Sequence, residues 1–245
     1  MYQKIKGEKY NIECKVWMPS KVERMIFAIH GFAGDNESSA IASLAEKMLD
    51  DNTMTVALDL PGHGKSEVDG DYLTLDNCFN DILTVENYYK EKYPEASIDY
   101  FATSFGAYLL LLLISKKKCL YNRIVLRCPA IAMDKIFVNA ILNDSLDEFE
   151  KKGYTIVGYE RELKVNYSFY KELIDNQIFD IYQINKNKIL IIHGDQDDTA
   201  PVADSIAFMK KYNTKMEIIK GADHRFKKEG ELDKVVELAR NFYNE

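Results

Sequence analysis

Short apolar runs rich in β-branched residues alternate along the chain with longer segments in which hydrophobic residues recur every three or four positions. Runs of this kind predict strands that are buried on both faces, because parallel strands covered by helices present no polar face to water. We therefore predict strands at Met25–His30, Met54–Asp59, Ile98–Thr103, Arg123–Cys128, Lys188–His193 and Lys215–Lys220.

The segments between these runs have the spacing of amphipathic helices. Residues 41–49 place their apolar side chains on one helical face, at positions i, i+3, i+4, i+7 and i+8. A second face begins at Phe79, after Asp76 as the expected N-cap, and a third covers residues 232–242. This alternation predicts an α/β fold with a mostly parallel central sheet flanked by helices. Residues 2–18 lack a helical stripe, and we expect an antiparallel hairpin there at one edge.

One stretch, between Cys128 and Lys188, does not follow the alternation of strands and helices. It is rich in tyrosine, phenylalanine and acidic residues, and it is too long for a structureless loop in a compact domain. We predict a single α/β domain over residues 1–245 with a cap subdomain inserted at about residues 131–180.

Ser104 lies at the end of a predicted strand, where ligands bind in open parallel sheets. It precedes an apolar helix at 107–115, within Ala-Thr-Ser-Phe-Gly. A nucleophile on such a sharp turn needs small residues two positions before and after it, and these are Ala102 and Gly106. The first position is usually glycine, so the match is incomplete, and a helix N-cap is the alternative role of Ser104.

A serine hydroxyl becomes an effective nucleophile only beside a base, so the histidines decide between these roles. His224 follows the last predicted strand and precedes the last helix. His30, His63 and His193 adjoin glycine in turns at strand ends, where satisfying the backbone is the alternative role. His224 is therefore the expected base.

The acid that orients this histidine should lie on the loop after the preceding strand. Asp195, Asp197 and Asp198 all occur there. We expect Asp197 to hold the imidazole tautomer and to stabilise the imidazolium, whereas Asp195, closer to the strand, is better placed for the turn itself.

Such chemistry also requires backbone N–H groups that face the developing oxyanion. The expected donors are Phe105, which follows the serine, and Phe32, which follows the first core strand. Gly31 and Gly34 would let that loop approach a substrate closely, and core packing is the alternative role of the Phe32 side chain.

Gly64-Lys65-Ser66 looks like the end of a phosphate-binding loop, but the pattern needs a glycine where Asp59 stands. Pro61 would also remove one backbone donor, so we interpret the segment as a structural turn. The formal net charge of −7 argues against a nucleic-acid partner, because a phosphate backbone requires a basic face.

The cysteines and the apolar stretches bear on location. Cys14, Cys78, Cys119 and Cys128 are dispersed without a metal-binding pattern, which favours buried reduced thiols over a disulfide or a zinc site. The longest uncharged stretch, Tyr100–Ser115, is shorter than a spanning helix, and the first residues carry no signal-peptide core. We expect a cytoplasmic protein without membrane insertion.

Taken together in chain order, the motifs resemble those of the α/β-hydrolase superfamily, and within it the small bacterial cinnamoyl and feruloyl esterases. The motifs are His-Gly-Phe at 30–32, Asp-x-Pro-Gly-His-Gly-x-Ser at 59–66, the Ser104 turn, His-Gly-Asp-Gln-Asp at 193–197 and Gly-Ala-Asp-His at 221–224. The resemblance implies a serine esterase that hydrolyses carboxylic esters through an acyl-enzyme intermediate, without a cofactor or metal. Ser104, Asp197 and His224 would form its catalytic triad.

The resemblance leaves the substrate open, between hydroxycinnamate and short-chain acyl esters. Phe169 and Tyr170 lie where the cap of such esterases contacts the acyl group, and cap core is the alternative role of both. A lipase, a thioesterase or a C–C bond hydrolase would share the triad, and a binding protein could keep the fold without turnover. The expected partner is a small ester, and the oligomeric state stays open, with a homodimer among the options.

Overall fold

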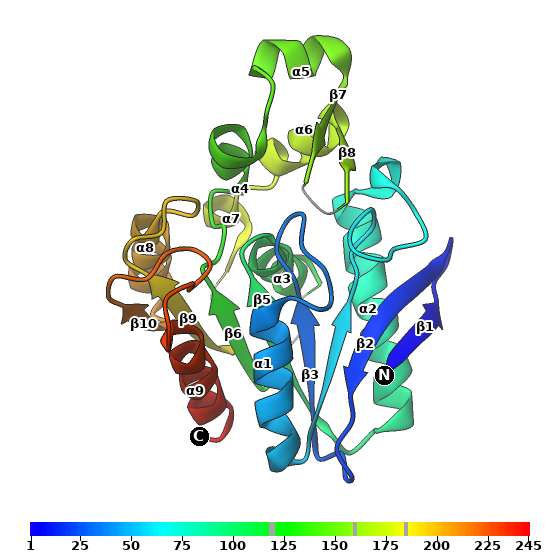
Figure 1. Cartoon of the computed structure of the whole chain (residues 1–245), viewed down its shortest axis with the longest axis vertical. Coiled ribbons are helices and arrows are strands. Elements are labelled where there is room, and N and C mark those ends of the chain that lie inside the picture. The colour runs from blue at the N-terminus through cyan, green and yellow to red at the C-terminus, as the bar shows by residue number, and fades with distance from the viewer. Residues whose placement is uncertain (118–120, 159–160, 184–185) are drawn as a thin grey trace.

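The computed structural model describes residues 1–117, 121–158, 161–183 and 186–245. In this part of the chain an eight-stranded sheet runs through the centre in the order β1-β2-β4-β3-β5-β6-β9-β10 (Figure 1). Its strands are β1 (Tyr2–Lys6), β2 (Asn11–Trp17), β3 (Arg24–Ile29), β4 (Thr53–Leu58), β5 (Ser97–Thr103), β6 (Arg123–Arg127), β9 (Lys188–Gly194) and β10 (Lys215–Ile219).

Strands β4, β3, β5, β6, β9 and β10 pair with one another in parallel. At one edge β1 and β2 form an antiparallel hairpin, and β2 joins it to β4 in antiparallel pairing. The mostly parallel sheet and the edge hairpin are therefore confirmed. Each of the strands predicted from the apolar runs begins and ends within one residue of its expected bounds. Every residue of β4 and β6 is buried, as expected for strands covered on both faces.

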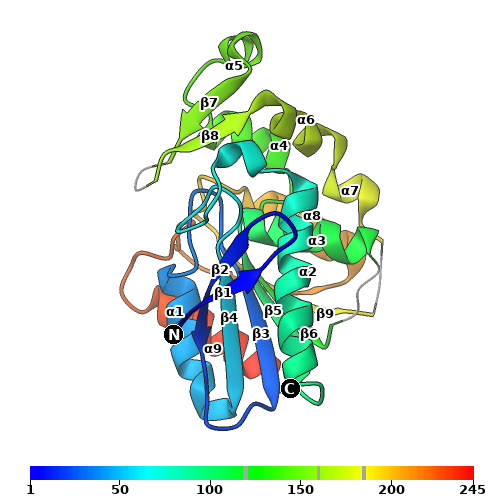
Figure 2. The same cartoon turned by 90° about the vertical axis from the view of Figure 1, so that its right-hand side faces the viewer.

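Helices cover both faces of the sheet (Figure 2). On one face α1 (Ser39–Met48) and α9 (Glu231–Tyr243) pack against Ile26 and Ala28 of β3. On the other face α2 (Leu75–Lys92), α3 (Phe105–Lys116) and α8 (Val202–Tyr212) pack on the side of Phe27 and Ile29. Alternate residues of one strand thus supply two separate hydrophobic cores.

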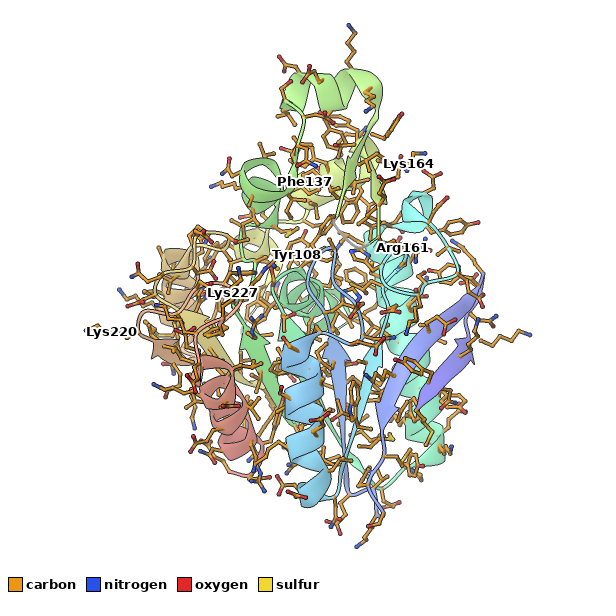
Figure 3. All side chains as sticks on the ribbon, viewed as in Figure 1. Tyr108, Phe137, Arg161, Lys164, Lys220 and Lys227 are labelled. Carbon is orange, nitrogen blue, oxygen red and sulfur yellow. The ribbon has the colours of Figure 1, made fainter. Side chains whose placement is uncertain are left out.

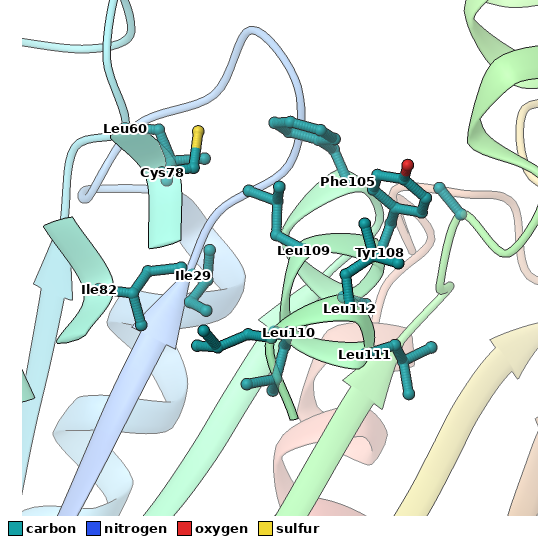
Figure 4. Packing of buried hydrophobic residues seen from close by; sticks show 14 of the residues in the cluster. Ile29, Leu60, Cys78, Ile82, Phe105, Tyr108, Leu109, Leu110, Leu111 and Leu112 are labelled. Carbon is teal, nitrogen blue, oxygen red and sulfur yellow. The ribbon is translucent and has the colours of Figure 1, made fainter. Parts of the chain in front are cut away.

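Two details of the helices differ from the sequence prediction. The N-cap of α2 is Thr74, whose hydroxyl accepts a hydrogen bond from the Asn77 N–H, and Asp76 lies inside the first turn. The helix α8, between β9 and β10, was expected only from the general alternation, without a buried face assigned to it. The helix α3 is buried on all sides from Phe105 to Ile114, and Figure 4 shows its leucines packed among Ile29 and Ile82.

The stretch between β6 and β9 forms an insert (residues 131–181) beyond the carboxyl ends of the strands (Figure 1). Its two short strands, β7 and β8, pair in an antiparallel sheet separate from the central one. The elements of the insert are α4 (Met133–Ile136), η3 (Phe137–Ile141), α5 (Leu146–Lys152), β7 (Tyr154–Val157), β8 (Leu163–Asn166), α6 (Tyr167–Asp175) and α7 (Ile178–Ile181).

The insert contacts the core at several points. The 3-10 turn η2 (Gly70–Tyr72) lies so close to β8 that a Cβ on Gly70 would come within 1.7 Å of the Lys164 carbonyl oxygen. The Tyr108 hydroxyl of α3 donates to the Asn176 carbonyl at 3.0 Å. The Glu172 carboxylate of α6 accepts a hydrogen bond of 2.8 Å from the Leu75 N–H at the start of α2.

Two smaller predictions can be compared with the structure. Cys14, Cys78 and Cys128 are buried free thiols, as expected, whereas Cys119 lies outside the described residues. Among the helices of the described segments, none combines the length and the apolar character that a membrane span requires.

Candidate active site

Ser104 occupies a strained turn between β5 and α3. Its backbone has φ of 50° and ψ of −113°, in a region that residues other than glycine rarely adopt. The turn fits tightly against β3, because a Cβ on Gly106 would come within 2.5 Å of the His30 carbonyl oxygen. This contact explains why a small residue follows Ser104 by two positions. Ser104 is the N-cap residue of α3 by position, and its carbonyl oxygen accepts the N–H groups of Ala107 and Tyr108. Its side chain makes no capping hydrogen bond, so the hydroxyl is not used to cap the helix.

Asp197 and His224 form a short hydrogen bond at the ends of β9 and β10. His224 Nδ1 lies 2.6 Å from Asp197 Oδ2, and the Asp197 side chain is fully buried while that of His224 is 16% exposed. Because an ionised carboxylate can only accept, His224 Nδ1 carries the hydrogen. The Nε2 atom of the neutral ring is then left as an acceptor, as a general base requires.

Asp197 has further donors that sequence reasoning did not assign. The backbone N–H groups of Thr199 and Ala200 donate to its Oδ1 atom at 2.9 and 2.7 Å. His193 Nε2 lies 3.1 Å from Asp197 Oδ2 and 2.9 Å from the Ala200 carbonyl oxygen. Both neighbours are acceptors, so Nε2 carries the hydrogen, and His193 Nδ1 accepts from the Ser205 hydroxyl at 2.9 Å.

These hydrogen bonds decide the charge of Asp197. Burial alone would raise the pKa of the carboxyl group, but the hydrogen bonds from His193 and His224 outweigh it and hold the pKa below its ordinary value. The carboxylate is therefore ionised, as it must be to stabilise an imidazolium at His224.

Asp195 and Asp198, the two other acids of this loop, make different contacts. Asp195 Oδ1 accepts a hydrogen bond of 2.6 Å from the Gly221 N–H, which joins the loop after β9 to the loop after β10. Asp198 is exposed and lies 3.3 Å from the Thr199 hydroxyl. Of the three acids on this loop, Asp197 is the one hydrogen-bonded to His224.

Arg127 links the loops that carry Ser104 and His224. Its carbonyl oxygen accepts the Ser104 N–H at 3.0 Å, and its guanidinium donates to the His224 carbonyl oxygen at 2.9 Å. Burial lowers the pKa of this arginine, and the guanidinium stacks over the Phe226 ring at 4.8 Å. Within the described chain the Ser104 hydroxyl makes no hydrogen bond to His224, and such contacts often tighten only when substrate binds.

Two backbone amides face the turn without hydrogen-bond partners. In the part of the chain that the structure describes, neither the Phe32 nor the Phe105 N–H donates to a protein acceptor. The Phe32 loop lies directly against the serine, since a Cβ on Gly31 would approach the Ser104 Cβ to 3.3 Å. A backbone N–H without a protein acceptor can donate to a ligand, so these two donors are free for one.

Buried polar groups fix the shape of the surrounding loops. Asp59 accepts hydrogen bonds from the N–H groups of Asn36 and Lys65, at 2.7 and 2.8 Å. Burial raises the pKa of its carboxyl group to about 6. A Cβ on Gly64 would meet this carboxylate at 2.4 Å. Asp59 therefore fills the space beside Gly64-Lys65-Ser66 where a phosphate would have to bind. This agrees with the interpretation of the segment as a structural turn.

The other two strand-end histidines satisfy backbone groups. His30 Nδ1 donates to the Gly31 carbonyl at 2.7 Å, and its Nε2 accepts the Leu60 N–H at 3.1 Å. His63 Nδ1 donates to the Pro61 carbonyl at 2.9 Å. Burial lowers the pKa to about 4 for His30 and to about 3 for His63. Both rings are neutral, which agrees with the role expected for them.

Aromatic side chains from the insert lie above these amides. The Phe32 ring contacts the rings of Phe105, Phe137 and Phe169, with centroids 5.3, 5.9 and 6.5 Å apart. Figure 3 shows Phe137 within the insert, above the sheet. Tyr170 packs instead against Phe137 and the interior of the insert. Sequence reasoning missed Phe137, because its contact with Phe32 spans a long stretch of chain and leaves no local pattern.

One group of side chains could be considered for metal binding. Ligand atoms of Cys128, His193 and Asp197 all lie within 4.8 Å of one another. However, both nitrogens of His193 and both oxygens of Asp197 are already engaged in hydrogen bonds. Burial also raises the pKa of the Cys128 thiol, which opposes the thiolate that a metal would need.

Comparison with known structures gives the same fold. Est1E from Butyrivibrio proteoclasticus, in a structure with bound ferulic acid, has a TM-score of 0.86 and 23% sequence identity, covering 98% of this chain and 97% of that one. Mouse alpha/beta hydrolase domain-containing protein 10 has a TM-score of 0.79 and 16% identity, covering 100% and 98%. The esterase domain of a Rhodothermus marinus protein has a TM-score of 0.73 and 13% identity, covering 99% and 96%.

No curated protein matches the chain. A family model described as "Serine aminopeptidase, S33", of the Hydrolase_4 group, matches residues 20–157, which is more than half of the chain. The match includes the Phe32 loop and the Ser104 turn and ends before the loops of Asp197 and His224. The chain is an α/β hydrolase and belongs to the serine aminopeptidase S33 family.

Proposed function

We propose that the protein hydrolyses carboxylic esters through an acyl-enzyme intermediate, with Ser104, Asp197 and His224 as its catalytic triad. The observation that carries the proposal is the 2.6 Å hydrogen bond between His224 Nδ1 and a buried, ionised Asp197. It leaves His224 Nε2 as an acceptor, and Arg127 links the His224 loop to the strained Ser104 turn. The N–H groups of Phe105 and Phe32, which have no protein acceptor among the described residues, support the proposal as donors to an oxyanion.

In the first half of the reaction Ser104 Oγ attacks the ester carbonyl carbon while His224 Nε2 takes the hydroxyl proton. The negative charge that develops on the carbonyl oxygen is stabilised by the N–H groups of Phe32 and Phe105. Asp197 stabilises the imidazolium and remains ionised. His224 then returns the proton to the leaving alcohol, and the acyl group stays on Ser104.

In the second half water replaces the alcohol. His224 Nε2 takes a proton from the water molecule as its oxygen attacks the acyl carbon, and the same two amides receive the second oxyanion. The tetrahedral intermediate breaks to release the carboxylic acid, and the proton on His224 returns to Ser104 Oγ. The proton that Ser104 loses leaves with the alcohol and is replaced by one from the water, so the cycle uses one water for each ester bond.

The insert is proposed as the cap that shapes the acyl pocket. Phe169 lies within ring-contact distance of both Phe32 and Phe105, whose amides would hold the oxyanion. A planar aromatic acyl group would stack well among these rings. The fold match to a structure titled with ferulic acid agrees with this choice of a hydroxycinnamate ester. Tyr170 would not contact the acyl group directly but would support Phe137, against which its ring packs.

A fluorophosphonate probe and an ester panel test the proposal. We expect the probe to label the wild-type protein and to leave Ser104→Ala unlabelled, because only an activated serine reacts. On methyl ferulate, p-nitrophenyl acetate and a long-chain ester, Ser104→Ala should lower kcat by about 10⁴ to 10⁶-fold. An aminoacyl p-nitroanilide in the same panel separates ester from amino-terminal amide cleavage. Equal turnover by pure wild type and Ser104→Ala would refute the triad.

A further inference from the structure

A cavity lies at the amino ends of β6, β9 and β10, opposite the strand ends that carry Ser104. It has a volume of about 640 Å³, which is within the range of small-molecule sites. Arg123, Lys188 and Lys215 line it, and each is the first residue of its strand, in β6, β9 and β10. Since the candidate active site is built on the carboxyl ends of the strands, this cavity is separated from it by the length of the sheet.

Arg123 is the unusual residue of this cavity. Only 8% of it is exposed, and its Nε atom is buried with no hydrogen-bond partner among the residues that the structure describes. Oδ1 of the buried Asp99 accepts the Arg123 backbone N–H at 2.8 Å, and its Oδ2 atom forms an ion pair of 3.2 Å with Arg24 Nε. A buried guanidinium donor without an acceptor costs free energy, which an anionic ligand would recover.

A second donor in the cavity lacks a partner as well. Thr214 Oγ1 is buried and makes no hydrogen bond within the described segments, and Thr214 lines the same cavity. Other buried side-chain atoms of the described residues also lack hydrogen-bond partners, for example Arg24 Nε and Thr55 Oγ1. Arg123 Nε and Thr214 Oγ1 differ from them in belonging to residues that line one cavity, which has room for a polar group from outside the chain.

The charge around the cavity also favours an anion. Lys188 is exposed and forms no ion pair with any residue that the structure describes. Lys215 is paired with Glu245, the one acidic residue of the described lining. Arg123, Lys188 and Lys215 therefore outnumber the acidic side chains in a protein whose overall formal charge is −7.

Part of the wall is aromatic. Tyr212 and Phe242 line the cavity and are largely buried, and Lys215 Nζ lies 5.6 Å from the centre of the Phe242 ring. A ligand that filled this volume would place apolar atoms against these rings while its charged group reached Arg123.

From these contacts we propose that this cavity binds a small organic anion, with its carboxylate or phosphate on Arg123, Lys188 and Thr214 and its apolar part against Tyr212 and Phe242. The guanidinium supplies paired donors for the acidic group. The site is independent of the hydrolytic reaction, because none of its residues belongs to the loops that carry Ser104, Asp197 or His224.

Benzoate and phenyl phosphate are suitable anionic probes, and benzyl alcohol is the neutral analogue. Titrations followed by ¹H–¹⁵N spectra of the full chain should move the amide signals of Lys188, Thr214 and Lys215. These signals distinguish the cavity from the catalytic loops, where the signals of Gly31 and Phe105 would move instead. We expect at least one of the anions to bind there, and the alcohol to bind at least tenfold more weakly.

Substitutions then test which side chains bind the anion. Arg123→Met should weaken binding of the anion at least tenfold, and Thr214→Val, which keeps the side-chain shape, should weaken it several-fold. Lys220→Met is the matched control, because it removes a positive charge just beyond the far end of β10 (Figure 3), and it should bind as wild type does. Thermal unfolding checks that each variant is folded.

The proposal is wrong if neither anion moves the cavity signals, if the alcohol binds equally well, or if folded Arg123→Met and Thr214→Val both retain wild-type affinity. Binding that moves only the signals of Gly31 and Phe105 would also overturn it, because the anion would then occupy the catalytic loops.

Discussion

We predict that the hydrogen bonds of Arg161 to the core stabilise the insert more than the exposed ion pair of Lys164 with Asp71 does. Arg161 lies at the junction of the insert and the core, close to Lys164 (Figure 3). Its guanidinium donates to four carbonyl oxygens of the loop after β4, those of His63, Gly64, Ser66 and Val68, at 3.3, 3.0, 2.9 and 2.8 Å. Hydrogen bonds to a charged group contribute about 1.5–3 kcal/mol each. The four share one guanidinium, and water would replace some of them, so we expect Arg161→Met to lower the free energy of unfolding by about 3 kcal/mol.

Lys164→Met provides the matched control on the same hairpin. It removes the same charge and breaks a 2.7 Å ion pair with Asp71, but both side chains are well exposed, so its midpoint in urea should stay close to that of wild type. Urea unfolding measures the difference, and hydrogen exchange in β7 and β8 shows whether the hairpin opens locally. Equal midpoints for the two variants, together with unchanged exchange in β7 and β8, would refute the reasoning that buried backbone carbonyls make Arg161 the stronger contact.

Three other changes test particular contacts. Burial raises the pKa of Asp81 to about 7, so its favourable contribution to stability is complete below about pH 4 and is lost as pH rises towards 7. Relative to Asp81→Asn, wild type should therefore lose about 3 kcal/mol of unfolding free energy between pH 4 and 8, and parallel urea midpoints across this range would contradict it. His193→Phe removes a buried donor to Asp197, and kcat/KM for an ester should fall by about 10 to 100-fold; an unchanged value would show that the contact is not needed. Gly106→Ala would bring a methyl group within 2.5 Å of the His30 carbonyl oxygen and should cost about 3 kcal/mol in urea unfolding, whereas a wild-type midpoint would mean that the turn can move.

The central sheet could be predicted almost residue by residue because its information is local. A strand buried on both faces must be apolar throughout, so β4 and β6 are visible as uninterrupted runs. The helix α3 is apolar on all sides, and its position after Ser104 was enough to identify it. In contrast, the N-cap of α2 was assigned to Asp76 instead of Thr74, since several polar residues precede the apolar face and only geometry distinguishes them.

Candidate site residues could be named from the sequence where reactive residue types follow predicted strands, whereas contacts between distant segments left no signal. Ser104, Asp197 and His224 each follow a strand, which is a signal in the sequence itself. His193 stands four residues before Asp197, a spacing that could have identified it as a partner. Arg127 gave no such signal, because its guanidinium reaches a carbonyl nearly a hundred positions away, at His224.

In the proposed reaction, the groups that would react are separate from the groups that hold the loops of the site in place. Asp59 fixes the loop that follows Phe32 through the Asn36 N–H, and Arg127 fixes both the Ser104 turn and the His224 loop. These holding groups are buried and belong to the sheet or to its first turns, so changing any of them would alter the reaction for every substrate. The side chains of the insert, in contrast, meet the site only through ring contacts such as that of Phe169 with Phe105. Ring contacts can be resized without unpairing a buried polar group, and substrate preference should therefore change through the insert while the chemistry stays the same.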